Sequence, residues 1–245
     1  MANLPDHLSF SVSDVSFSLR LVSHGSFQMG ADASTDPDAD KVESPVHTVT
    51  LTRDFYVAET PVTQALYEAV MGANPSSFKG DPSLPVERVT IKNCVSFISK
   101  LNKLIPDVKF SLPTEAEWEF AARGGILSKG FKYAGSDVID EVAWYEDNSD
   151  LHPHPVAQKK PNELGLYDMS GNVCEWCLDN FWDSYSSSAP VTDPNGSNLG
   201  GTTVARGGSY YFEARRCRST YRFGFRCDSK IGFNGFRIIT RIDKP

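Results

Sequence analysis

Apolar and polar residues alternate along the early part of the chain. Short runs of this kind lie between residues 16 and 57, and their apolar positions are Phe17, Leu19, Leu21, Val46, Val49, Leu51, Phe55 and Val57. A period of two is typical of strands with one buried face, so we predict antiparallel strands here. The acidic stretch from Asp32 to Asp40 contains Pro37 and interrupts the pattern, which predicts a loop.

Three later segments have the period of amphipathic helices. Thr63 is a candidate N-cap for a helix that runs to Met71 and stops at Gly72. Apolar residues from Cys94 to Ile105 recur at three- and four-residue spacing and predict a second helix, which ends at Pro106.

The third helix has the clearest start and stop signals. Thr114 and Glu117 have the spacing of a capping box, and Gly124-Gly125 follows the apolar stripe of Trp118, Ala121 and Ala122. Residues 126–245 show no regular period, and we predict long ordered loops there, with closing strands near Val204–Arg206 and Phe236–Ile242. The fold class is therefore α+β, with a small antiparallel sheet, a few helices and much irregular structure.

Composition narrows the class of protein. The 245 residues are 40% hydrophobic and 22% charged, and we expect them to form a single globular domain, residues 1–245, and a monomer. No apolar run is long enough to span a bilayer, so we expect no insertion into a membrane. A net charge of −7 argues against nucleic acid as a partner. One basic cluster near the C-terminus has mainly structural roles in our interpretation: Arg206, Arg215, Arg216, Arg218, Arg222, Arg226 and Arg237.

The cellular compartment stays open at this point. The first seven residues lack the basic and apolar segments of a signal peptide. A cell-surface or extracellular location would follow if an export or lipoprotein signal has been removed. The five cysteines, an odd number, leave the redox compartment undecided.

Several motifs together resemble the formylglycine-generating-enzyme, or sulfatase-modifying-factor, family. They occur in the family's order between residues 20 and 240, and they are Gly25-Ser26-Phe27-Gln28-Met29-Gly30, Pro45-Val46-His47-Thr48-Val49, Leu112-Pro113-Thr114-Glu115-Ala116-Glu117-Trp118-Glu119, Asn162 to Val173, Arg206-Gly207-Gly208-Ser209 and Gly235-Phe236-Arg237. The resemblance implies a C-type-lectin-like fold of the formylglycine-generating-enzyme type. We also expect Trp118 and Trp176, which lie within or beside these motifs, to be core residues.

The oxidases of this family use two cysteines that bind copper. The first lies two residues after a Gly-Gly-Ser-Tyr-like turn and the second five residues further on, which are Phe212 and Cys217 here. A phenyl ring cannot replace a thiolate ligand of Cu(I), so we expect no copper and no formylglycine formation by that mechanism. A rearranged oxidoreductase site that uses Cys217 is the alternative.

The resemblance also implies a calcium site. In the family, the segment equivalent to Asp168 to Glu175 holds Ca²⁺, which here would use Asp168, Glu175 and the carbonyls of Gly171 and Val173. The alternative is that the two carboxylates only accept hydrogen bonds. Cys174 and Cys177 form a C-x-x-C pair that could be part of a zinc site together with Cys217 and Cys227. The spacing between Cys217 and Cys227 is wider than in known zinc motifs, so we prefer to interpret these residues as small buried thiols.

Aromatic residues concentrate near the C-terminus. Eight of the 27 residues from Tyr210 to Phe236 are aromatic, against 11% of the whole chain. Consecutive rings and rings interleaved with Gly and Arg cannot all face one interior, so we predict a solvent-facing patch of Tyr211, Phe212, Phe223, Phe225 and Phe233.

This composition resembles the variable region of proteins diversified by retroelements, a group that includes a spirochaete surface lipoprotein. The resemblance places a variable binding surface within residues 206–237, and its candidate ligand-binding residues are Tyr210, Tyr211, Phe212, Tyr221, Phe223, Phe225, Cys227, Asp228, Phe233 and Asn234. The function predicted from the sequence is non-catalytic binding of another protein or a cell-surface ligand.

Overall fold

A computed structural model describes residues 4–34, 36–182, 184–196 and 201–242. Residues 1–3 of the segment examined for a signal peptide and Thr35 of the predicted acidic loop lie outside the described residues. Among the described residues, no helix combines the length and apolar composition needed to cross a membrane.

A five-stranded sheet brings the two ends of the described chain together. Its order is β1 (His7–Val12), β2 (Val15–Val22), β5 (Phe55–Ala58), β12 (Ile239–Arg241) and β6 (Phe110–Ser111), with every neighbouring pair antiparallel. The last strand, β12, lies between β5 and β6, so the C-terminal segment closes the sheet. This confirms the predicted strand near Phe236–Ile242.

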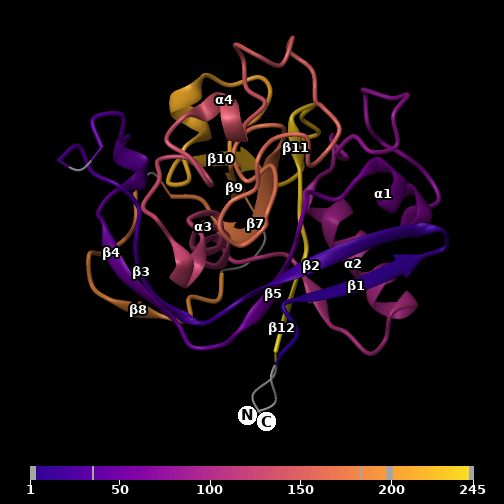
Figure 1. The fold of residues 1–245 in the computed structure, drawn as a ribbon, viewed down its shortest axis with the longest axis horizontal. Coiled ribbons are helices and arrows are strands. Elements are labelled where there is room, and N and C mark those ends of the chain that lie inside the picture. The colour runs from indigo at the N-terminus through magenta and orange to yellow at the C-terminus, as the bar shows by residue number, and fades with distance from the viewer. Residues whose placement is uncertain (1–3, 35, 183, 197–200, 243–245) are drawn as a thin grey trace.

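Two smaller sheets complete the β structure. One has the order β10 (Arg222–Arg226), β9 (Thr202–Arg206), β7 (Cys174–Asn180) and β11 (Asn234–Gly235), and the other contains β3 (Gly25–Met29), β4 (His47–Leu51) and β8 (Val191–Thr192). In Figure 1, the three-stranded sheet and helices α1 and α2 lie on opposite sides of the four-stranded sheet. The pairing of β3 with β4 across the acidic loop, and of β2 with β5, confirms the antiparallel strands predicted from alternation.

The three predicted helices form where their capping residues place them. Thr63 caps α1 (Gln64–Met71), which ends at Gly72 with a φ of 81°. Thr90 caps α2 (Ile91–Leu104), and Thr114 forms the predicted capping box with Glu117 at the start of α3 (Glu115–Ala122). A fourth helix, α4, is a single turn (Ile139–Val142), and three short 3₁₀ turns are η1 (Lys41–Glu43), η2 (Gly125–Leu127) and η3 (Ala214–Cys217).

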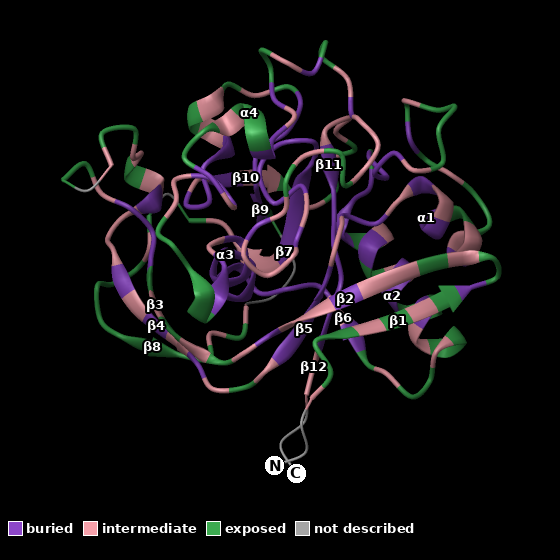
Figure 2. Cartoon of the chain, viewed as in Figure 1, coloured by how far each residue is buried: buried purple, intermediate pink, exposed green. Residues whose placement is uncertain are grey.

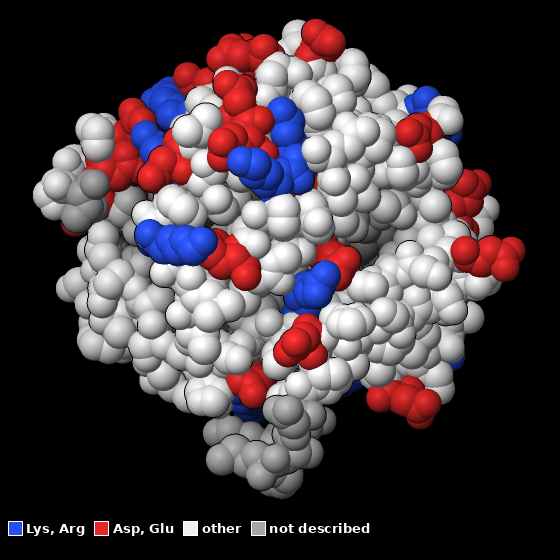
Figure 3. Space-filling model, viewed as in Figure 1, with Lys and Arg blue, Asp and Glu red and all other residues white. Residues whose placement is uncertain are grey.

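Burial concentrates on α3 and on the strands at the centre of the fold. All eight residues of α3 are buried, and Figure 2 shows β7 and α3 mainly purple while β1 and the outer loops carry exposed residues. One apolar cluster packs α1 and α2 against Trp176 and Phe236, and a second surrounds Trp118. On the face seen in Figure 3, acidic side chains are spread around the margin, consistent with the net charge of −7.

Trp118 and Trp176 are each about 1% exposed or less, which confirms them as core residues. Replacing either with Ala is expected to lower the free energy of unfolding by about 3–5 kcal/mol, because the deletion leaves a cavity. Trp182 is 70% exposed, so Trp182→Ala is a matched control that should cost little. Chemical denaturation of the three variants measures this. Equal losses at all three positions would show that this description of the core is wrong.

Candidate ligand-binding site

A Gly-Gly turn begins the segment that carries the candidate site. Gly207 and Gly208 have φ values of 94° and 72°. A Cβ at Gly208 would lie 2.5 Å from the Cys217 Sγ, so only glycine fits between the turn and the thiol. The turn therefore packs directly on η3 and fixes where residues 209–217 lie.

Buried arginines hold this segment to the rest of the fold. Arg222 donates to both carboxylate oxygens of Glu115, at 2.5 and 2.8 Å, and Arg206 pairs with Glu119. Arg237 donates to both oxygens of Glu175 at 2.6 Å. The interpretation of these arginines as structural is confirmed.

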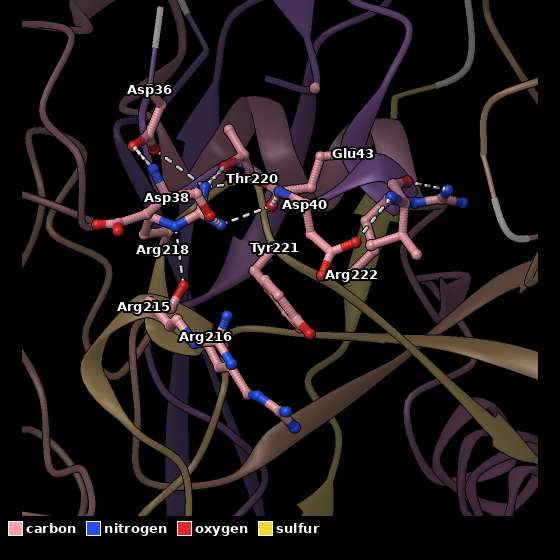
Figure 4. A network of polar contacts seen from close by, with 12 residues as sticks. Asp36, Asp38, Asp40, Glu43, Arg215, Arg216, Arg218, Thr220, Tyr221 and Arg222 are labelled. Atoms are coloured by element: carbon pink, nitrogen blue, oxygen red, sulfur yellow. Dashed lines mark hydrogen bonds and ion pairs between the residues drawn. The ribbon is translucent and has the colours of Figure 1, made fainter. Parts of the chain in front are cut away.

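Arg218 ties the same segment to the acidic loop. Its guanidinium is fully buried and pairs with Glu43 at 2.5 Å and with Asp36 at 3.0 Å. It also donates to the carbonyl of Asp38 at 2.7 Å. Figure 4 shows these acids converging on Arg218, while Arg216 and Tyr221 lie together below the network. The stretch predicted as a loop is therefore an anchor for the residues on either side of Arg218.

Between these anchors, six aromatic rings touch one another in an unbroken series, which we call the aromatic face: Tyr211, Phe212, Tyr221, Phe223, Phe225 and Phe233. Phe212 is central, with ring centroids 4.7 Å from Phe223 and 4.8 Å from Phe233. Tyr211 stacks on Phe233 at 5.6 Å, Tyr221 meets Phe223 at 4.8 Å and Phe225 lies 5.6 Å from Phe223. Rings distant in sequence thus form one surface.

Exposure divides the candidate residues into two groups. Tyr211 is 54% exposed, Asp228 is exposed, and Phe212, Tyr221, Phe225, Cys227 and Phe233 are half-buried. Tyr210, Phe223 and Asn234 are buried, at 5%, 6% and 0% exposed.

The prediction that Phe223 faces solvent is therefore wrong, and Tyr210 and Asn234 do not lie at the surface either. Phe223 is covered by Phe212, Tyr221 and Phe225. The Tyr210 hydroxyl donates to the carbonyl of Gly232 at 3.1 Å, and Asn234 is part of strand β11. These three residues support the face from below.

Cys217 lies beside position 212 but has no second thiol there. Its Sγ is 4.0 Å from the Phe212 carbonyl oxygen, so the two positions are neighbours in space as the motif predicts. Burial raises the pKa of the Cys217 thiol to about 12. The thiol is protonated at neutral pH, and a protonated thiol is a poor nucleophile and metal ligand.

Burial and the nearby Cys217 thiol raise the pKa of Cys174, but Cys174 and Cys177 do not share a site. Cys174 and Cys177 lie on the same strand, β7, but pack into two different apolar clusters. Among the described residues, no group of three or more His, Cys, Asp or Glu side chains is placed to hold a metal ion. The arrangement agrees with the preferred interpretation of Cys174 and Cys177 as buried thiols, and burial raises the pKa of both.

Both carboxylates of the calcium hypothesis accept hydrogen bonds from protein groups in this structure. Both oxygens of Glu175 accept from Arg237, and one also accepts from the Trp118 indole N–H at 2.6 Å. Asp168 accepts from the Ala157 N–H at 2.8 Å and from the Asn172 amide at 3.3 Å. The cation that pairs with Glu175 in this structure is the Arg237 guanidinium. Calcium binding stays a prediction.

One contact at the face was missed in the sequence. Arg216 lies over two rings, with its guanidinium carbon 5.6 Å from the centroid of Phe212 and 6.0 Å from that of Tyr221. Sequence reasoning grouped Arg216 with the structural arginines. Phe212 precedes Arg216 by four residues and Tyr221 follows it by five. The segment has no helical period that would place both rings beside Arg216, and only the folded turn around η3 brings them together.

Comparison with known proteins identifies the family. Residues 17–242 match the sulfatase-modifying factor enzyme 1-like domain. The chain belongs to this family. Chaperone protein LppX of Paenibacillus barcinonensis is 34% identical over 92% of this chain and 90% of its own length. The formylglycine-generating enzyme of Streptomyces coelicolor is 31% identical over 89% of this chain and 88% of its own.

A solved structure gives the same result for the fold. Treponema denticola variable protein 1 superposes with a TM-score of 0.88 at 30% identity, covering 98% of this chain and 100% of that one. The C-type-lectin-like fold of the formylglycine-generating-enzyme type is thereby confirmed, as is the likeness to a variable protein. In this family member, position 212 holds Phe in place of the cysteine that the oxidase motif requires.

The buried carboxyl of Asp168 predicts a pH dependence of stability. Burial raises its pKa from 3.8 to about 6. The folded protein binds this proton more tightly than the unfolded chain, so stability is greatest below the unfolded pKa and falls as the pH rises through about 6. Asp168→Asn keeps an acceptor for the Ala157 N–H, and Asn tolerates the φ of 56° at this position.

We therefore expect Asp168→Asn to reduce the decline in stability between about pH 4 and pH 7, by up to about 3 kcal/mol. Urea denaturation at a series of pH values measures it. Asp107→Asn, at an exposed loop position, is the matched control and should leave the profile unchanged. If the stability of Asp168→Asn falls with pH in parallel with that of the unaltered protein, Asp168 is not the titrating group.

Proposed function

We propose that this domain is a non-catalytic recognition module that binds another protein through the aromatic face. The observation that carries the proposal is the unbroken series of six rings, with Tyr211 54% exposed at its edge. Aromatic side chains offer large contact areas with few rotatable bonds, so ordering them on binding costs little entropy. Half-buried rings are also already held in place by their neighbours.

The anchoring of the segment supports the same function. Buried ion pairs at Arg206, Arg218, Arg222 and Arg237 fix the chain on both sides of the rings. The side chains between these anchors can differ without removing a buried charge partner. This is the property that a diversified binding surface requires, and we extend the proposal to a variable region like that of the Treponema variable protein.

Within this proposal, the ten candidate ligand-binding residues fall into two groups according to their exposure. Tyr211, Phe212, Tyr221, Phe225, Cys227, Asp228 and Phe233 are reachable by a ligand, whereas Tyr210, Phe223 and Asn234 set the shape of the surface beneath them. A reverse-transcriptase gene beside a near-copy of the 3′ end of this gene is the expected genomic setting. A neighbouring sulfatase gene would favour the oxidoreductase.

The alternative, an oxidoreductase that uses Cys217, has less support. The thiol is buried, and burial raises its pKa to about 12. Position 212, which the family's oxidases use for the second thiol, supplies a ring that packs on three others.

Exposed and buried rings of the face should behave differently on substitution. Tyr211→Ser and Phe233→Ser are expected to leave the melting temperature nearly unchanged, and Phe223→Ser to lower it clearly, because only Phe223 is buried. A peptide selected on this domain from a displayed library of random peptides is the binding probe. We expect at least one accessible ring to contribute about 2 kcal/mol to its affinity.

Melting curves and titration calorimetry of the same variants test both parts. Binding that survives every ring substitution would refute the proposed function. Unfolding of the Tyr211 and Phe233 variants would instead show that these rings belong to the core.

A catalytic assay separates the two functions. Given Cu(I), oxygen and a cysteine-containing sulfatase peptide, the purified protein is expected to yield no aldehyde, since Phe212 provides no second thiol. Mass spectrometry of the peptide detects the product, and the Streptomyces coelicolor enzyme is the positive control. Phe212→Cys places a thiol beside Cys217 and shows whether this residue alone prevents the reaction. Aldehyde above the no-enzyme level with the unaltered protein would contradict the proposal.

A further inference from the structure

An arginine with unoccupied donors lies at the edge of the aromatic face. The Arg216 side chain is 36% exposed, and its Nε lies 3.2 Å from a Glu213 carboxylate oxygen. Within the part of the chain that the structure describes, no hydrogen bond is made by its two Nη groups. The same guanidinium lies over Phe212 and Tyr221, so these donors are presented next to the rings.

The segment that carries the rings differs from the whole chain in the sign of its surface charge. From residue 210 to residue 234, the exposed or half-buried charged side chains are Arg215, Arg216, Arg226, Lys230, Glu213 and Asp228, which is four cations against two anions. The whole chain carries −7. Acidic residues also adjoin the face: the Glu146 N–H donates to the Phe212 carbonyl at 3.1 Å, and Asp40 and Glu43 lie near Tyr221. The excess of positive charge is therefore local and does not extend around the entire rim.

We infer that the aromatic face binds an acidic protein segment, in which an apolar side chain packs on the rings while a carboxylate pairs with Arg216. The inference rests on the proposed function and adds the chemistry of the partner. A guanidinium held over rings keeps its planar fork oriented, and that fork matches a carboxylate in a two-bond geometry. A lysine at this position would keep the charge but could not form the planar two-bond contact with a carboxylate.

The net charge of the chain allows local pairing with Arg216 to be distinguished from long-range electrostatic attraction. An overall charge of −7 repels an acidic partner at long range. Preference for acidic ligands can then arise only from cations at the binding surface itself. Arg216 contacts two rings of the face, whereas Arg215, which is 50% exposed and pairs with Glu213, contacts none among the described residues.

The test uses the full chain and the displayed library of random peptides. Peptides that bind the unaltered domain but not Phe233→Ser are sequenced, and their mean net charge is compared with that of the unselected library. We expect a shift to negative charge together with an apolar or aromatic residue. For one selected peptide, Arg216→Gln is expected to weaken binding about tenfold, as loss of a charged pair at a hot spot does.

Two controls separate pairing from net charge. Arg53→Gln removes the same charge from an exposed position outside the segment and should have little effect, and Arg216→Lys should restore only part of the affinity. The melting temperatures of all three variants should match that of the parent.

The possible outcomes are distinct. Ring-dependent peptides of neutral or positive charge, or equal effects of Arg216→Gln and Arg53→Gln, would overturn the acidic partner and leave the proposed function standing. Selected peptides that bind independently of the rings would overturn both.

Discussion

The fold depends on the pairing of glutamates on α3 with arginines from the end of the chain. Glu115 pairs with Arg222 and Arg206, Glu119 with Arg206, and Glu117 with Arg241. One buried helix thus binds strands β9, β10 and β12, which lie more than eighty residues later in the sequence. Such pairs are not strongly favourable compared with apolar packing, yet removing one partner leaves a buried charge that costs about 3–5 kcal/mol. The main effect of these ion pairs is therefore to determine which segments pack together, and their net contribution to stability is small.

This constraint explains how an irregular segment can carry a defined surface. Residues 207–221 contain no strand, yet Arg206, Arg218 and Arg222 are buried at fixed positions along and beside them. The rings of the aromatic face then need to pack only on one another and on the edge of the core. Tyr211 is 54% exposed and Phe233 packs on the edge of the core, whereas Phe223 lies under three other rings. Buried support and exposed surface are separated by depth within the same cluster.

Local signals were readable from the sequence, and long-range ones were not. Thr63, Thr114 and Gly72 identified helix ends because capping involves residues three or four positions apart. The family motifs gave the fold. Burial of Phe223 depends on Phe212, eleven residues earlier, and alternation along β10 gives no sign of it. Glu175 belongs to a motif that holds calcium in the family, but its carboxylate is paired with Arg237, sixty-two residues later, and no local pattern reveals that contact.

The framework of this segment and the side chain at position 212 depend on different contacts. The Gly-Gly turn, the buried Cys217 and the arginine anchors are needed to build the segment, because a Cβ at Gly208 would meet the Cys217 sulfur at 2.5 Å. Copper chemistry needs one thing more, a second thiol at position 212, and that position faces the other rings and makes no ion pair. A substitution there leaves every anchor intact. Position 212 can therefore hold a ring of the aromatic face without disturbing the framework that positions it.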